Sequence, residues 1–154
     1  MDVLLTINGQ TRTLHVEPFE TLLTSLRDRL GLTGAKRGCN QGVCGACSVL
    51  IAGQPARACL SLTANCVDRE VTTAEGLSVP LELSPLQAAM VQGGAIQCGF
   101  CTPGMLITLT ALLKERPHPS REEIRIAISS NICRCTGYQK IVDAVSKLGA
   151  ESAA

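Results

Sequence analysis

The chain opens on a strand-like alternation. Val3, Leu5 and Ile7 share one face of a predicted strand, with polar or opposite-face residues between them. Asn8-Gly9 follows, a dipeptide strongly favoured in two-residue hairpin turns, and Gln10–Val16 continues as the partner strand. The first sixteen residues are therefore predicted to form a β-hairpin.

A helical period replaces the alternation after Pro18. Leucines recur at helical spacing between Thr21 and Leu30, and Gly31 follows as a C-terminal stop. Three short strands separated by turn residues are then predicted at Ser48–Ile51, Gln54–Ala58 and Glu70–Thr73. A small mixed sheet with one helix packed across it is a β-grasp arrangement.

The period changes again in the second half of the chain. Residues 76–84 show no sustained periodicity and are predicted to link two domains. Beyond them, four segments have helical patterns: Pro85–Gly93, Thr102–Arg116, Arg121–Ser130 and Tyr138–Leu148. A capping box of Ser120 and Glu123 precedes the third. The expected fold is α+β, with a β-grasp domain over residues 1–75 and an all-α four-helix-bundle domain over residues 85–154.

Composition indicates a globular protein with an aliphatic core. Of 154 residues, 45% are hydrophobic but only one Tyr and two Phe are aromatic, so Leu, Val, Ile and Ala must fill the core. The formal net charge of +1 argues against a nucleic-acid-binding surface. No apolar run approaches the roughly 18 residues of a membrane span, so no transmembrane segment is expected.

Nine cysteines carry the candidate chemistry, and eight of them fall into two sets of four. The first set is spaced C-x4-C-x2-C, with a fourth cysteine after eleven intervening residues: Cys39, Cys44, Cys47 and Cys59. Plant-type ferredoxins hold a [2Fe-2S] cluster with this spacing. Glycines within the loop let its backbone approach the inorganic sulfides closely.

The second set has a less specific spacing and consists of Cys98, Cys101, Cys133 and Cys135. Four thiolates suit zinc as well as an iron–sulfur cluster. Thioredoxin-like redox pairs or four disulfides are further alternatives, although neither C-x2-C pair lies in a βαβ pattern. These cysteines are expected in loops that open onto helix N-termini, where free N–H groups and the helix dipole suit a negatively charged cluster.

Cysteine usage also bears on the compartment. Nine cysteines in 154 residues is about 6%, below the roughly 8 to 10% of short disulfide scaffolds. No secretory signal or twin-arginine pair precedes them. A reducing compartment, the cytoplasm, is therefore expected, and there clustered cysteines bind metal more often than they form disulfides.

Three cysteine motifs together resemble those of a known family. They are GCNQGVCGACSV at Gly38–Val49, QCGFCTPGM at Gln97–Met105 and NICRCTGY at Asn131–Tyr138. In this order and spacing they resemble the small iron–sulfur subunit of the xanthine oxidase family of molybdenum hydroxylases. The resemblance covers nearly the whole chain, and it implies one [2Fe-2S] cluster on each set of four cysteines, in place of zinc on the second.

The resemblance also implies a function, which is electron transfer within a heteromeric enzyme. Electrons would run from the molybdopterin centre of a large subunit through the second cluster to the first, and out to FAD on a medium subunit or to a cytochrome. Gln97 matches a glutamine that hydrogen-bonds the pterin, and the Cys135 backbone would lie near the same cofactor. Substrate would be hydroxylated on the large subunit, because no nucleophile with a base, carboxylate pair or further phosphate-binding loop is evident in this sequence.

A freestanding two-cluster electron carrier that docks transiently to several enzymes is the alternative function. An obligate subunit would differ from it in burying an extensive apolar interface. Two residues stand apart from the motifs. Ser130 lies where the family commonly has glycine, and Cys66, which matches no ligand position, is expected to be a small buried hydrophobe.

Overall fold

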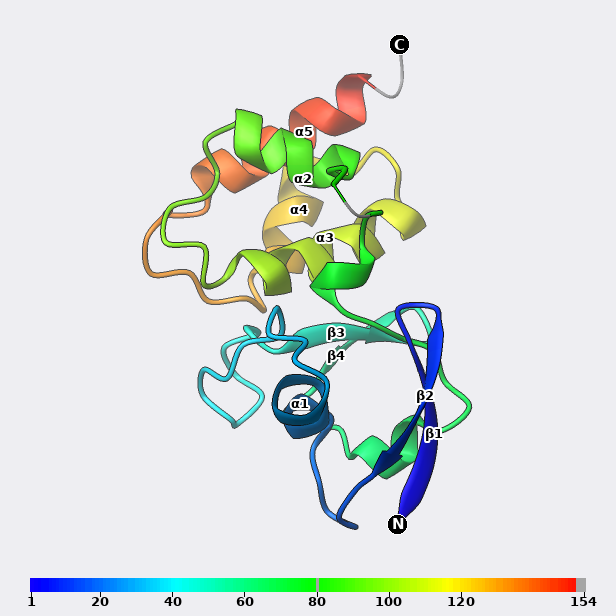
Figure 1. Cartoon of the computed structure of the whole chain (residues 1–154). Helices are drawn as coiled ribbons and strands as arrows, with labels where there is room; N and C mark the ends of the chain where they lie inside the picture. The colour runs from blue at the N-terminus through cyan, green and yellow to red at the C-terminus, as the bar shows by residue number, and fades with distance from the viewer. Residues whose placement is uncertain (80, 152–154) are drawn as a thin grey trace.

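The computed structural model describes residues 1–79 and 81–151. Pro80, within the predicted linker, and residues 152–154, within the predicted second domain, lie outside the described residues. Strands dominate the first part and helices the second, and the two parts are stacked one above the other in Figure 1. We call residues 1–79 the sheet half and residues 81–151 the helical half.

A mixed sheet of five strands forms within the described residues, in the order β2-β1-β5-β3-β4. Its strands are β1 (Asp2–Ile7), β2 (Gln10–His15), β3 (Ser48–Ile51), β4 (Gln54–Arg57) and β5 (Val71–Thr72). β1 is parallel to β5, and the other neighbouring strands are antiparallel. All the predicted strands are confirmed, with ends that differ by no more than one residue.

Both predicted hairpin turns are present, and Asn8-Gly9 has the backbone geometry that this dipeptide favours. Asn8 and Gly9 have φ of 51° and 74°, and Ala52 and Gly53 have φ of 50° and 78°. Positive φ at both central residues gives a turn whose twist matches that of the flanking strands. The turn of each hairpin fixes the register of its two strands. In the first hairpin, alternate residues of β1 point into the core.

The predicted helix at residues 21–30 is present, but it is not a regular α-helix. α1 (Leu22–Thr24) continues directly into a π-helical turn, η1 (Ser25–Arg29). In this turn the Leu30 N–H donates to the carbonyl oxygen of Ser25, five residues back, over 3.1 Å. The prediction of a uniform α-helical period was therefore wrong for the second turn of the segment.

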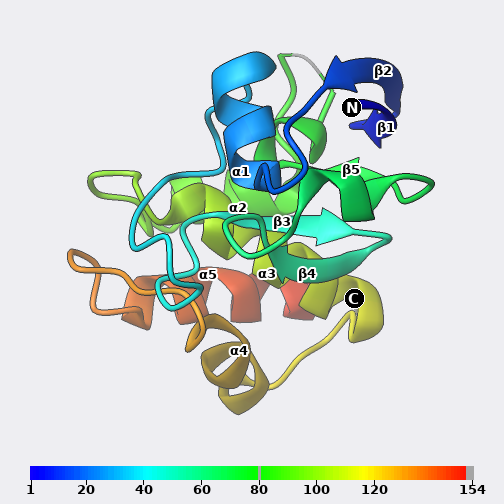
Figure 2. The same cartoon turned by 90° about the horizontal axis from the view of Figure 1, so that it is seen from below.

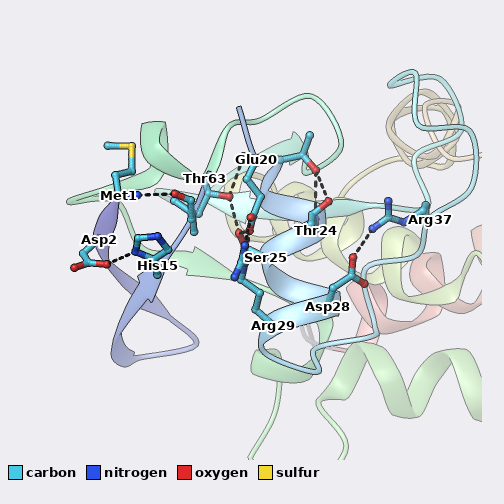
Figure 3. A network of polar contacts seen from close by, with 12 residues as sticks. Met1, Asp2, His15, Glu20, Thr24, Ser25, Asp28, Arg29, Arg37 and Thr63 are labelled. Carbon is cyan, nitrogen blue, oxygen red and sulfur yellow. Dashed lines mark hydrogen bonds and ion pairs between the residues drawn. The ribbon is translucent and has the colours of Figure 1, made fainter. Parts of the chain in front are cut away.

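A polar network lies at this wider turn (Figure 3). The buried Ser25 donates its hydroxyl hydrogen to Glu20 over 2.5 Å, and its Oγ lies 2.8 Å from Thr63 Oγ1. The Glu20 carboxylate also accepts two hydrogen bonds from Arg29, at 2.7 and 2.5 Å. These bonds, with smaller help from Ser25, overcome the effect of burial and lower the pKa of Glu20 to about 2. The network ties the helical segment to the 3₁₀ turn η2 (Thr63–Cys66).

Four helices lie in the described part of the helical half: α2 (Pro85–Gln92), α3 (Thr102–Glu115), α4 (Arg121–Ile128) and α5 (Gln139–Glu151). The predicted capping box of Ser120 and Glu123 is confirmed, and Ser84 and Gln87 form a second one before α2. Tyr138 was predicted to begin the last helix, but its φ of 67° excludes it from α5. None of the described helices is long and apolar enough to cross a lipid bilayer.

Each half has its own hydrophobic core. The core of the sheet half combines the inner faces of β1 and β3 with the leucines of α1, and it includes Cys47, Cys59 and Cys66. The core of the helical half draws on all four helices and includes Met90 and Cys101. Cys66 is 1% exposed, which confirms the prediction of a small buried side chain. Burial also raises the pKa of its thiol.

α3 connects the halves by packing on β3 (Figures 1 and 2). Val49 and Ile51 belong to the core of the sheet half, so Leu50 between them points to the opposite face of the strand. Leu50 is nevertheless buried, as is Ile107 of α3, although neither belongs to one of the two cores. We infer that α3 covers the second face of β3.

Candidate metal centres

Three cysteine-bearing loops gather at one side of the molecule. Loop 38–47 of the sheet half lies next to loops 94–101 and 129–138 of the helical half, at the left of Figure 1 and again in Figure 2. One backbone hydrogen bond joins them directly, because the Ile132 N–H donates to the Cys44 carbonyl oxygen over 2.9 Å. The two predicted sites are therefore neighbours across the junction of the halves.

Backbone N–H groups of the first loop point at a thiol. The Gln41 and Cys44 N–H groups lie 3.3 and 3.4 Å from Cys39 Sγ. Hydrogen bonds from Cys44 and then Gln41 lower the pKa of Cys39 to about 6, which favours the thiolate that metal binding requires. Gly38 allows the close approach in this loop, because a Cβ there would lie 2.8 Å from Cys44 Sγ.

The other two cysteines of the first set are buried. Cys47 precedes β3 and Cys59 follows β4, so the antiparallel pairing of these strands brings the two thiols together. Burial is the main reason that the pKa of Cys47 rises to about 11; a hydrogen bond from the Cys59 backbone opposes this rise, and the Cys59 thiol adds to it. A buried thiol of this kind becomes a thiolate when a positively charged metal replaces its proton.

The second set combines thiols from two loops. Cys98 and Cys135 are exposed, and their sulfur atoms lie 3.5 Å apart. Cys101, the residue before α3, is buried and interacts with the half-buried Cys133. Burial raises the pKa of Cys101 to about 12. Burial also raises the pKa of Cys133, but hydrogen bonds from the Thr136 hydroxyl and backbone N–H outweigh the effect of burial and lower this pKa to about 7.

The eight thiols thus form four interacting pairs, which are Cys39 with Cys44, Cys47 with Cys59, Cys98 with Cys135 and Cys101 with Cys133. A [2Fe-2S] cluster takes four thiolates in two pairs, one pair on each iron. The donor chemistry and the N–H groups aimed at sulfur fit this group. In the part of the chain that the structure describes, no three His, Cys, Asp or Glu side chains have the spacing of a single metal ion site.

Gln97, the predicted pterin contact, lies immediately before the exposed Cys98 and is itself exposed. Cys135, the second residue predicted to lie near the pterin, contacts Cys98 from the other loop. The structure therefore brings Gln97, Cys98 and Cys135 to the same open edge of the second site. An external cofactor could reach this edge without a rearrangement of the helices.

Sequence reasoning missed the side chains that hold the second loop. The Tyr138 hydroxyl accepts a hydrogen bond from the Cys133 N–H at 2.8 Å and donates to the Asn131 carbonyl oxygen at 3.1 Å. The left-handed backbone of Tyr138 turns the ring back over this loop. The sequence signal for this contact was Gly137-Tyr138, separated by one residue from the last cysteine, but Tyr138 also fitted the helical pattern that follows.

Two family models together match most of the chain. A model described as "2Fe-2S iron-sulfur cluster binding domain" matches residues 5–80, and one described as "[2Fe-2S] binding domain" matches residues 73–146. Each match contains one complete set of four cysteines. The chain therefore has two [2Fe-2S]-binding domains and two clusters.

Small subunits of known enzymes are similar to the chain over most of its length. The nicotinate dehydrogenase small FeS subunit of Eubacterium barkeri is 45% identical over 141 residues, which cover 92% of this chain and 90% of that protein. The nicotine 6-hydroxylase small subunit of Paenarthrobacter nicotinovorans is 50% identical over 139 residues, which cover 90% of this chain and 84% of that protein.

Solved structures of related enzymes are also similar to the chain. A chain of quinoline 2-oxidoreductase from Pseudomonas putida 86 superposes with a TM-score of 0.95 at 48% identity, over 99% of this chain and 95% of that one. The aldehyde oxidoreductase from Desulfovibrio desulfuricans superposes with a TM-score of 0.94 at 45% identity, but this chain spans only 17% of that polypeptide. From the motifs, the domain matches and these relatives, we conclude that the chain belongs to the xanthine oxidase family of molybdenum hydroxylases, as a small [2Fe-2S] iron–sulfur subunit with an electron-transfer role.

Proposed function

We propose that each set of four cysteines holds one [2Fe-2S] cluster. Cys39, Cys44, Cys47 and Cys59 would hold the first, and Cys98, Cys101, Cys133 and Cys135 the second. The geometry that carries the proposal is the contact of 3.5 Å between the Cys98 and Cys135 sulfur atoms, together with backbone N–H groups that point at the sulfur atoms of Cys39 and Cys133. Bound clusters would supply reversible one-electron chemistry.

The protein's own groups would stabilise the bound clusters. N–H groups of Gln41 and Cys44 at the first site, and of Thr136 at the second, point at ligand sulfur atoms. Hydrogen bonds to sulfur withdraw negative charge from it and raise the reduction potential of a cluster. Buried Cys47 and Cys101 would keep water from the inner side of each site.

The open edge of the second site would face the molybdopterin centre of a large subunit. Gln97 and Cys135 are exposed there, so a side-chain amide and a backbone group could hydrogen-bond a pterin. The first site would pass electrons outward to FAD on a medium subunit or to a cytochrome. Electrons would therefore cross the junction from the second site, in the helical half, to the first site, in the sheet half.

Exposed apolar side chains favour a subunit over a freestanding carrier. Val43 and Leu60 are 62% and 63% exposed at the first loop, and Phe100 and Ile132 are 47% and 51% exposed at the second. Apolar residues gathered beside both sites are typical of a surface that a permanent partner covers. Recovery of the chain in a stable complex with a large subunit, at sub-micromolar concentration, would distinguish the two functions.

The proposed domain boundaries stay as predicted, with the first domain over residues 1–75, a linker over 76–84 and a four-helix-bundle domain over 85–154. The separate hydrophobic cores of the two halves support this division. A cytoplasmic location stays a prediction from cysteine usage.

The test of the ligand assignment is elemental analysis combined with electron paramagnetic resonance. The anaerobically purified chain should contain about four irons and four sulfides and, after dithionite reduction, should give two distinguishable S = 1/2 signals. Two irons with one equivalent of zinc would contradict the assignment for one set. Iron without acid-labile sulfide would contradict it for both.

A further inference from the structure

A single arginine bridges the loops of the two cysteine sites. Arg57, the last residue of β4, donates from Nη2 to the Ser130 carbonyl oxygen in the helical half over 2.6 Å. The same guanidinium donates to Ser48 Oγ at 2.5 Å and, more weakly, to the Gly42 carbonyl oxygen at 3.4 Å, both in the sheet half. Its planar fork therefore fixes the two halves to one rigid group.

A buried asparagine makes the reciprocal bridge from the helical half. Asn131 is 1% exposed, and its Nδ2 donates to the Gly45 carbonyl oxygen at 3.0 Å and to Ser48 Oγ at 3.4 Å. Its Oδ1 accepts a hydrogen bond of 2.8 Å from Thr108 of α3. The amide is satisfied on both sides, and this is required of a polar group buried at a junction.

The backbones of the two halves touch where these side chains meet. A Cβ on Gly45 would lie 2.5 Å from the Ser130 carbonyl oxygen, and one on Gly104 of α3 would overlap the Gly45 carbonyl oxygen. The Ile132 N–H donates to the Cys44 carbonyl oxygen in the same place. This hydrogen bond joins Cys44 of the first site to the residue that precedes Cys133 of the second site.

We propose that Arg57 and Asn131 are positioning residues that fix the separation and orientation of the two cysteine sites. Domains joined by a short linker move relative to each other unless their interface restrains them. Here the restraint consists of directional hydrogen bonds, those of Asn131 buried and those of Arg57 partly exposed, placed within three residues of cysteines in both sites, and such networks specify one geometry. This proposal rests on the assignment of one cluster to each cysteine set.

The test measures the magnetic interaction between the two clusters in the full-length chain. With both clusters reduced, their two S = 1/2 spins split each other's signals by an amount set by their separation and orientation. Arg57→Met removes the bridge while it keeps the length of the side chain, and Asn131→Leu removes the second bridge at similar volume. Iron content and the signals of the partly reduced chain report separately that both clusters are present.

Arg27→Met is the matched control. Arg27 also donates to two backbone carbonyl oxygens, those of Thr33 at 2.9 Å and Ala35 at 2.8 Å, but both belong to the sheet half. We expect the control to keep the wild-type splitting, Arg57→Met to reduce or broaden it at full iron content, and Arg57→Lys to restore part of it.

Unchanged splitting in an iron-replete Arg57→Met chain, or an equal change in Arg27→Met, would overturn the proposal. If Asn131→Leu fails to retain iron, Arg57→Met with Arg57→Lys decides the question. A wild-type chain without two iron signals would instead refute the cluster assignment itself, so the two failures are distinguishable.

Discussion

Cys47 and Cys59 of the first site are part of the core of the sheet half, whereas Cys98 and Cys135 of the second site are exposed on loops. Of the second set, only Cys101 is buried, and Cys133 is half-buried. The first site therefore has two thiols in the core of its half, whereas the second site has two thiols exposed at an edge of its half. The more exposed second site suits the contact with a molybdopterin centre that we propose for it.

Removal of a buried thiol at the first site should have the largest effect. Cys47→Ala is expected to lower iron from about four atoms per chain to about two and to destabilise the sheet half, because it loses both core contacts and the folding energy that bound metal supplies. The protein part of this loss should be about 1–3 kcal/mol. Iron analysis and thermal unfolding of the same sample measure the two effects.

Cys66→Ala is the matched control for Cys47→Ala. Cys66 lies in the same core and is equally buried, but it belongs to neither ligand set. It should show a similar loss of protein packing while it retains all the iron. Loss of iron in Cys66→Ala, or full iron in Cys47→Ala, would contradict the assignment of the first set.

Removal of an exposed thiol at the second site should remove one centre and leave the other. Cys98→Ala is expected to abolish one of the two spin signals, to halve the iron and to preserve the signal of the first centre, because the two ligand sets lie in separate halves with separate cores. Unfolding of the sheet half should change little. Simultaneous loss of both signals would show that the two centres do not assemble independently.

One polar network in the sheet half and one ion pair in the helical half differ in burial, and the next two variants use this difference. Glu20 is 6% exposed in its network with Ser25 and Arg29, while Arg121 and Asp143 pair on the surface of the helical half at 44% and 42% exposure. At pH 7, Glu20→Gln should cost about 1–3 kcal/mol of unfolding free energy. Asp143→Asn should change it little. Urea unfolding of both variants makes the measurement.

The pH dependence of this difference follows from the lowered pKa of Glu20. Because its folded pKa is about 2 and its ordinary value is 4.5, the carboxylate contributes its full stabilisation above about pH 4.5 and loses it as the pH falls toward 2. The stability gap between wild type and Glu20→Gln should therefore narrow below pH 4.5. A gap that stays constant down to pH 3 would contradict the role of the carboxylate.

Local sequence patterns predicted most of the fold. Val3, Leu5 and Ile7 are buried as their alternation predicts, and the hairpin after them has the turn that Asn8-Gly9 favours. These features depend on neighbouring residues only. The π-helical turn at Ser25 was not predicted, because the groups that the Ser25 hydroxyl contacts include Thr63, which is 38 residues away in the chain.

Prediction of the two cysteine sites from the sequence was limited in the same way, to features that depend on local spacing. Cysteine spacing identified the eight candidate ligands, since thiols have few other reasons to cluster in this way. Arg57 and Asn131 carry no such signal, because they act on backbone carbonyl oxygens of Gly45 and Ser130, and any residue supplies a carbonyl oxygen. The contacts that join the halves became visible only when α3 was placed against β3.

The smallest effect is expected from Gln97→Ala at the open edge of the second site. Gln97 is exposed and is not a ligand, so both centres should keep their iron and their spin signals, and stability should stay within about 0.5 kcal/mol of wild type. In the complex with a large subunit, however, the loss of the amide should slow reduction of the centres by substrate. Rapid-mixing absorbance measurements would follow this rate, with Gln54→Ala, an exposed glutamine on β4, as the control. Equal rates in the two variants would mean that the open edge is not where electrons enter, and the distinction between an entry site and a relay site would then rest on burial alone.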